Sequence, residues 1–544
     1  MRRPAPRRFE SLEPRLAMAG MFQFSDVDGD IVTVRTNRGT NGQLAAALTL
    51  TPTGSLGGLQ LRQVSLNAPA FTGTNLTITA RPGPSGGDGQ VDVGEILSSL
   101  DLGRVTVGGD LGRIVAGNRN RATPGLVAFT ANSLGLRGTL TGAAETSSFV
   151  TGSVPTIRIA SHFVGAFGVR GRAADAVIGG TILGVNPGDG FSADSIGRMV
   201  VGGNIYGGTD LNSGSVAAGA GGITRLVIGG DVVGGAGDGS GRVVSLGRIG
   251  FARIAGSVIG SNGLQSGGVM AGAGGIGRLV VGGGITGGGV DGSGGIQAFG
   301  PVGSITVGGS IMGGSGGASG IVYAPAGIGT LDVTGKLWGR LGAMSGSVVA
   351  TRIGTLRLGG IEAGDGAQSG SVRAVSLGTV VVRGDIAGSL LQPALIVALG
   401  AATPTGPRAI GSLTVGGNMT GTFVLGGYDP FGLTPGNAAA RIGAVTVRGN
   451  MTGSSIVAGV TNPVIGSMGM PQFGNGQDTA IAGRRGSRID SLVVGGVADG
   501  SPIPGDSFGV VANSIGTVRL GGQSHTVTRA GITPTGTNLV FQLI

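Results

Sequence analysis

Residues 276–288 read IGRLVVGGGITGG, and close copies of this phrase recur along most of the chain. Clear copies begin at Ile196, Val302 and Ile410. Repetition at a period of about 20–50 residues is typical of solenoid proteins, in which each repeat buries its apolar face against its neighbours. Counting weaker copies, the units start at 102, 131, 154, 173, 196, 223, 249, 276, 302, 328, 353, 377, 410, 442, 489 and 515.

Each unit has a constant internal pattern. Its fourth and sixth residues are apolar in every copy, and its eighth is glycine in all copies except one, where Ser161 stands instead. Apolar residues with a spacing of two predict a β-strand with one buried face. The glycine is often followed by Asn or Asp, as at Asn204 and Asp231. These residue types tolerate a positive φ, so the pattern predicts a sharp turn after the strand.

Two further short apolar segments complete a unit, for example around Ile285 and Val348. Three short strands in about 26 residues predict one coil of a parallel β-helix, in which like strands stack from coil to coil. The predicted fold is therefore all-β. A motif at 1–21 precedes a small β cap domain at 22–85, about sixteen coils occupy 86–522, and a cap strand lies at 523–544.

Composition narrows the class of protein. Of 544 residues, 121 are glycine; hydrophobic residues make up 40% and charged residues 12%, which is unlike a disordered chain. There is no cysteine, which excludes disulfides and thiolate chemistry. The net charge of +10 suits anionic polymers such as acidic polysaccharides. The arginines are dispersed and aromatics are only 4%, so specific nucleic-acid binding is not expected.

No transmembrane segment is predicted. The nearest candidate is the uncharged stretch 386–407. Gln392 and Pro393 interrupt it, and its repeat register favours two strands of the coil.

The best candidate ligand site is the acidic stretch SDVDGD at 25–30. Asp26, Asp28 and Asp30 alternate around a glycine, and carboxylate oxygens are the ligands that calcium prefers. The distal glutamate of an EF-hand loop is absent, since position 37 is Asn. The alternative is a solvated acidic turn before the strand predicted at 31–36. No other cofactor is expected.

A second glycine-rich stretch, GGDGQVDVG at 86–94, superficially resembles a calcium-binding nonapeptide. That architecture needs tandem copies. The later units lack the aspartate, so this interpretation is rejected.

The outward positions of the predicted first strand show no paired acids of the kind that glycoside-cleaving enzymes need. These positions do include a column of arginines, which suggests an anionic ligand. The chain has only two histidines, His162 and His525, which lie far apart in the sequence. The chain is therefore expected not to be an enzyme. The arginine column consists of Arg104, Arg198, Arg225 and Arg278.

Two other functions are considered. A carbohydrate-active β-helix enzyme would use acids in the C-terminal loops, such as Asp429 and Asp478. An ice-binding face of outward threonines is disfavoured because Arg357 and Arg519 interrupt it.

The long C-terminal insertions, at 427–437 and 462–487, carry large apolar and acidic side chains. They predict a partner-binding edge, and the alternative is that these side chains fold back over the coil. The candidate residues are Tyr428, Asp429, Phe431, Met470 and Phe473.

Residues 7–18, RRFESLEPRLAM, resemble the LEPR-XLL motif near the N-terminus of large repetitive planctomycete surface proteins. Leu16-Ala17-Met18 departs from the two leucines typical of that motif. The stretch FSDVDGDIVTV at 24–34 resembles the segment that precedes glycine-rich strand repeats in such proteins. The resemblance implies export to the cell surface, and with the repeats it predicts a non-catalytic structural or adhesive protein. The matching residues are Arg7, Phe9, Glu10, Leu12, Glu13, Pro14 and Arg15.

Overall fold

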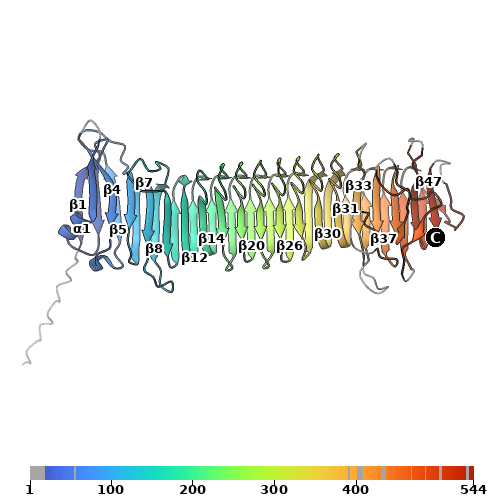
Figure 1. The fold of residues 1–544 in the computed structure, drawn as a ribbon, viewed down its shortest axis with the longest axis horizontal. Helices are drawn as coiled ribbons and strands as arrows, with labels where there is room; N and C mark the ends of the chain where they lie inside the picture. Colours follow the sequence, from blue (N-terminus) through green and yellow to red (C-terminus); the bar gives the residue numbers. More distant parts are fainter. Residues whose placement is uncertain are drawn as a thin grey trace, which may run out of the picture.

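The computed structural model shows an elongated, nearly all-β protein whose strands lie across its long axis (Figure 1). Hydrogen bonds join 45 of the described strands into one sheet, mostly parallel, and β40 (Val460–Thr461) and β41 (Thr479–Ala480) form a separate pair. The architecture is therefore solenoid-like. The structure describes residues 19–53, 57–389, 392–400, 408–430, 436–466, 469–483, 486–501, 505–533 and 538–544.

The strands form three stacked columns. The first column contains the predicted first strands, which in several repeats run on into the neighbouring columns: β7 (Leu102–Ala116), β8 (Leu126–Leu134), β10 (Val154–Ile159), β12 (Ala166–Ile178), β14 (Gly190–Val201), β17 (Ile223–Ile228), β20 (Ile249–Ile254), β23 (Ile276–Val281), β26 (Val302–Val307), β29 (Ile328–Trp338), β30 (Val348–Glu362), β31 (Val372–Val382), β34 (Ile410–Val415), β37 (Arg441–Val447), β42 (Arg488–Val494) and β45 (Ser514–Leu520).

The second column consists of two-residue strands after the turn: β11 (Phe163–Val164), β13 (Ile182–Leu183), β15 (Ile205–Tyr206), β18 (Val232–Val233), β21 (Val258–Ile259), β24 (Ile285–Thr286), β27 (Ile311–Met312), β32 (Ile386–Ala387), β35 (Met419–Thr420), β38 (Met451–Thr452) and β43 (Ala498–Asp499). The third column comprises β9 (Ser147–Thr151), β16 (Ser215–Ala218), β19 (Val243–Ser245), β22 (Val269–Ala271), β25 (Ile296–Ala298), β28 (Val322–Ala324), β33 (Ala394–Ala398), β36 (Thr422–Gly426), β39 (Ser455–Ala458), β44 (Phe508–Ala512) and β47 (Leu539–Leu543), with the first halves of several longer strands.

The pairing confirms the repeat register over most of the chain. Ile276, for example, pairs with Ile249 on one side and Val302 on the other, all three being predicted unit starts. The fourth-place residues Leu279 and Ile305 are at most 1% exposed. The apolar residues of successive units therefore stack into one continuous core.

The predicted unit start at 131 is wrong. In the structure Leu102 pairs with Leu126, so this unit begins five residues earlier and its fourth residue is Phe129. Leu134, the predicted fourth residue, is buried in the next column, and Leu136, the predicted sixth, is 47% exposed. The sequence pattern does not distinguish the two registers, because Leu134 and Leu136 also have a spacing of two and are followed by Gly138 at the expected eighth place.

The physical reason for the conserved eighth-place glycine also differs from the prediction. Gly230 and Gly256 do not have positive φ. Instead, a Cβ on Gly230 would lie 1.9 Å from Oδ1 of Asn204, the ninth-place residue of the preceding unit, and one on Gly256 would lie 2.0 Å from Oδ1 of Asp231. Glycine is required because the neighbouring side chain occupies the space of a Cβ.

That neighbouring side chain connects successive units. Oδ1 of Asn204 accepts a hydrogen bond from the backbone N–H of Asp231 at 2.7 Å, and Oδ1 of Asp231 accepts one from Ser257 at 2.6 Å. The same arrangement links Asn418 to Asn450 at 2.9 Å. The Asn or Asp after the glycine thus satisfies a backbone donor at the turn of the next unit.

A second turn, between the second and third columns, is built around a buried serine. Oγ of Ser240 accepts from the N–H of Gly235 at 2.9 Å, and the residues on either side of it, Gly239 and Gly241, have positive φ. The residue before this serine has positive φ in seven consecutive units and is not always glycine: Asn212, Gly239, Gln265, Gly292, Ala318, Met344 and Gln368.

Ala318 offers a test of this turn. Its φ of 49° is costly for a residue with a Cβ, by about 1–2 kcal/mol. Allowing for the greater flexibility of unfolded glycine, about 0.5–1 kcal/mol, Ala318→Gly should stabilise the protein by roughly 0.5 kcal/mol and raise the melting temperature. Ala324→Gly, at a buried strand position without positive φ, should lower it. A decrease for both variants in a calorimetric scan would contradict this account of the turn.

The N-terminal segment joins the stack directly. Strand β2 (Ile31–Thr36) is antiparallel to both β1 (Gly20–Ser25) and β5 (Leu76–Arg81), and β5 is parallel to β7. Strand β3 (Leu48–Pro52) is antiparallel to β4 (Leu59–Ser65), which is parallel to β6 (Val93–Leu97). A short 3₁₀ turn lies at Pro69–Phe71. Backbone pairing therefore continues from the segment predicted as a cap into the repeats.

This segment also contains the helix α1 (Asn41–Ala47), which was not predicted. Its start has a capping box, in which the Thr40 side chain accepts from the N–H of Gln43 and the Gln43 side chain accepts from the N–H of Thr40. Thr followed three residues later by Gln is a recognisable start signal.

At the C-terminal end, β47 pairs in parallel with β44, and β46 (Gln523–His525) turns back antiparallel on β45. Among the helices that the structure describes, none is long and apolar enough to cross a membrane.

Candidate functional site

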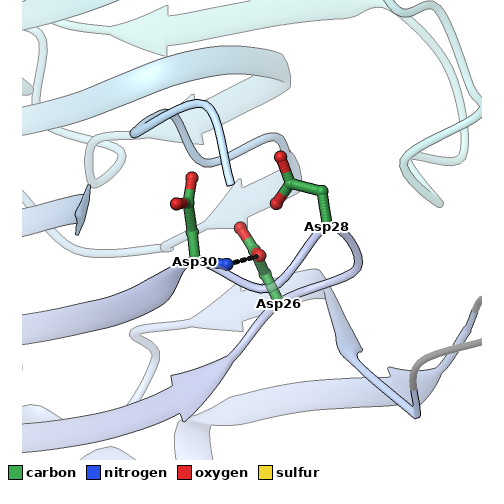
Figure 2. Close-up of side chains that lie close together, drawn as sticks. All are labelled: Asp26, Asp28 and Asp30. Atoms are coloured by element: carbon green, nitrogen blue, oxygen red, sulfur yellow. Dashed lines mark hydrogen bonds between the residues drawn. The ribbon is translucent and has the colours of Figure 1, made fainter. Parts of the chain in front are cut away.

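The three predicted calcium ligands lie in the turn that connects β1 and β2. The turn is closed by two hydrogen bonds, from the N–H of Asp26 to the carbonyl of Asp30 at 2.9 Å and from the N–H of Asp30 to Oδ1 of Asp26 at 2.8 Å. Figure 2 shows the carboxylates of Asp26, Asp28 and Asp30 on the same side of this turn. One oxygen from each lies within 4.8 Å of the others, so the sequence correctly grouped these residues.

The turn is not a solvated one, contrary to the alternative considered from the sequence. Asp30 is fully buried and Asp26 is 9% exposed; only Asp28 is open to solvent. Burial arises because the glycine-rich segment 82–92 folds over the turn. The N–H of Gly89 donates to Oδ2 of Asp30 at 2.7 Å, and the N–H of Asp88 donates to Oδ2 of Asp28 at 3.2 Å.

Glycine at 87 permits this close approach. Its φ is 117°, and a Cβ there would lie 1.8 Å from Oδ1 of Asp30. Sequence reasoning treated 25–30 and 86–94 separately, because no local pattern shows that two segments about 60 residues apart meet.

Crowding of the carboxylates changes their protonation. Burial, together with the hydrogen bond to Asp28 and its charge, raises the pKa of Asp26 to about 7. The hydrogen bond from Asp26 lowers the pKa of Asp28. Burial raises the pKa of Asp30. Three acids are thus held close together although two of them resist ionisation.

Asp26 and Asp28 border an open pocket of about 610 Å³ between the N-terminal segment and the first units. Asp88 and Asp92 also line it. Two arginines also line the pocket. Arg137 pairs with Asp92 at 3.1 Å, and Arg62 belongs to strand β4. The pocket is therefore predominantly acidic in a protein whose net charge is +10.

The predicted arginine column is not continuous. Phe251 stands between Arg225 and Arg278 in the register, and the guanidinium of Arg225 lies over its ring, 4.8 Å from the centroid. Arg198 pairs with Asp175 at 2.7 Å. Two of the three arginines named here thus have a partner within the protein, which weakens the argument for an anionic ligand there.

A groove of about 720 Å³ runs across four units beside the second column. The second residues of the short strands line it, with Met312 pairing with Trp338 in the next unit. The guanidinium of Arg340 lies 4.7 Å from the centroid of the Trp338 ring, and Leu341 on its rim is 69% exposed. Glycines, including Gly313 and Gly339, make up much of its lining. No sequence pattern predicts this groove, although Trp338 is the single tryptophan of the chain.

The residues predicted to form a partner-binding edge are turned inward. Phe473 is fully buried, Met470 is 2% exposed, and the Tyr428 ring packs edge-on against Phe473 with centroids 6.3 Å apart. Asp429 forms a nearly buried ion pair with Arg373. These positions favour the alternative that the loops fold back over the coil. Phe431 lies outside the described residues.

The acids suggested for an enzymatic alternative are held by protein donors. Asp478 accepts from the side chain of Asn462 at 2.8 Å and from the N–H of Gly474 at 2.7 Å, and burial raises its pKa. The ion pair with Arg373 engages Asp429. Both carboxylates therefore have evident structural roles in fixing the loops.

Comparison of the chain with models of known protein families, with curated proteins and with solved structures gave no match. The class of protein is therefore defined by the fold alone: a long, mostly parallel, solenoid-like β-protein with an acidic pocket near its N-terminal end.

Proposed function

We propose that the chain is a non-catalytic structural and adhesive protein of the cell surface. In this proposal it is a parallel β-helix of about sixteen coils at 86–522, with a small β cap at 22–85, a cap strand at 523–544 and a sorting motif within 1–21. The observation that carries the proposal is the continuous core, in which like positions of successive units pair in register from β10 to β45. Such stacking makes a rod with long, repetitive faces.

The expectation of a surface location rests on the resemblance of residues 7–18 to a sorting motif; these residues lie outside the described part of the chain. Fractionation of the native cells tests it. Recovery with the envelope or the medium is expected, and recovery with the cytosol would contradict a surface role.

The groove beside Trp338 supports the adhesive part of the proposal. Its lining combines an aromatic ring, an arginine stacked on that ring, and the acid Asp365. Aromatic faces with a few polar groups at the rim are typical of sites that bind extended polar ligands. The ligand proposed is a surface or extracellular polysaccharide.

Binding of the full chain to immobilised acidic and neutral polysaccharides tests this assignment. Saturable binding is expected, and Trp338→Ala should weaken it about tenfold, equivalent to about 1.4 kcal/mol. Tyr206→Ala is a matched control, since Tyr206 occupies the same position of an earlier short strand, outside the groove. Absence of binding, or equal loss in both variants, would contradict the proposal.

A further inference from the structure

We infer that the acidic turn between β1 and β2 binds one calcium ion, held by the carboxylates of Asp26, Asp28 and Asp30, and that this ion fastens the segment 82–92 to the N-terminal strands. This inference is independent of the proposed adhesive function. It concerns the stability of the N-terminal end of the stack.

The separation of the carboxylates fits calcium. Calcium–oxygen bonds are about 2.3–2.6 Å long, so two oxygens on one ion lie at most about 5 Å apart. The Asp26, Asp28 and Asp30 oxygens, all within 4.8 Å of one another, meet this limit. Magnesium demands a rigid octahedron and gives up its water ligands reluctantly, so three carboxylates in one turn suit calcium better. The open pocket leaves room for the water ligands that complete six to eight oxygens.

An independent observation concerns Asp30. Its side chain is fully buried, and no donor reaches Oδ1 with hydrogen-bond geometry, although Oδ2 accepts from Gly89. A buried carboxylate oxygen without a partner is costly, and such a charge is normally paired or bound to a metal. No basic side chain forms an ion pair with Asp26, Asp28 or Asp30 among the described residues. A divalent cation would supply the missing partner.

The ion would act across two segments. Asp88 and Gly89 already donate backbone hydrogen bonds to Asp28 and Asp30, so segment 82–92 is oriented around the same carboxylates. Asp92, in the same segment, accepts from the N–H of Asp110 in β7. Neutralising the carboxylate cluster should therefore stabilise the junction between the N-terminal strands and the repeats.

Calorimetric titration of the chelator-treated full chain with calcium, up to about 5 mM, provides the test. This exceeds the ~10⁻³ M dissociation constants of weak extracellular calcium modules. One ion per chain and a rise in melting temperature are expected. Magnesium should bind more weakly. No heat and no melting shift, or equal binding of magnesium, would overturn the inference.

Asp26→Asn separates binding from a merely structural role. It retains an oxygen that can accept the N–H of Asp30 but removes a charge from the crowded cluster. In chelator its melting temperature should equal or exceed that of the unmodified protein, and the calcium-induced rise should disappear. Asp28→Asn, at the exposed position, should reduce calcium affinity at least tenfold. Asp194→Asn, an exposed acid far along the chain, should leave the calcium response unchanged. An intact calcium response in Asp26→Asn and Asp28→Asn would contradict the assigned ligands.

Discussion

Gly230→Ala should destabilise the protein by about 3 kcal/mol. The new Cβ would lie 1.9 Å from Oδ1 of Asn204, which no rotation of the methyl group relieves. The Asn204 side chain would have to move and so lose its 2.7 Å hydrogen bond from the N–H of Asp231. Overpacking costs typically about 1–3 kcal/mol, and an unsatisfied donor about 1–3 kcal/mol more. Thermal unfolding followed by circular dichroism measures the loss.

Gly108→Ala is the matched control. Gly108 also lies in a strand of the stack without positive φ, but a Cβ there would meet its nearest neighbour, the carbonyl oxygen of Ile78, at an ordinary 3.5 Å. Little change is expected. If both variants unfolded at the same temperature, the steric explanation of the eighth-place glycine would be wrong.

Leu331→Ala should cost about 2–5 kcal/mol, as buried leucine truncations do. Leu331 is fully buried and pairs with Ile305 and Leu356 in the adjacent units. A cavity here interrupts the apolar column that connects successive units. Because each unit is stabilised mainly by its neighbours, backbone amides of the adjoining coils should also exchange faster.

Leu246→Ala provides the comparison, since Leu246 is 65% exposed. Its effect on stability should stay within about 0.5 kcal/mol. A similar loss in both variants would show that the core column does not control stability.

The repeat register was predictable because the same apolar positions recur in every unit, and most predicted starts pair directly in the structure. The exception at 131 arose because Leu134 and Leu136 repeat the apolar spacing of two, although the unit starts at Leu126 in the structure. Phe251 and Asp175 likewise interrupt a column that appeared uniformly basic when only the arginines were considered. The spacing of the repeats alone therefore does not show which residues pair between successive units where a unit is irregular.

The reason for glycine could not be derived from the local sequence. Positive φ is a property of one residue, whereas the clash between Gly230 and Asn204 involves two residues that lie 26 positions apart, in successive units. The serine turn was missed because its recurring Ser-Gly pair does not stand out in a glycine-rich chain. By contrast, the helix α1 had a local signal, Thr40 with Gln43, that a search for capping boxes would have found.

The candidate site was predictable only in part. The spacing of Asp26, Asp28 and Asp30 placed three carboxylates in one turn, but their burial depends on segment 82–92, which meets them only in the folded chain. For the C-terminal loops, the sequence predicted a binding edge where the structure has buried side chains, Met470 and Phe473. Large apolar side chains in an insertion can pack inward as readily as they bind a partner, and the sequence does not distinguish the two.

The central claim, a non-catalytic rod, is tested most directly by incubating the full chain with the polysaccharides used for binding and measuring their length distribution by size-exclusion chromatography. The account predicts saturable binding with an unchanged distribution. Shortened polysaccharide that persists in Trp338→Ala and disappears in Asp429→Asn or Asp478→Asn would contradict it and establish the enzymatic alternative.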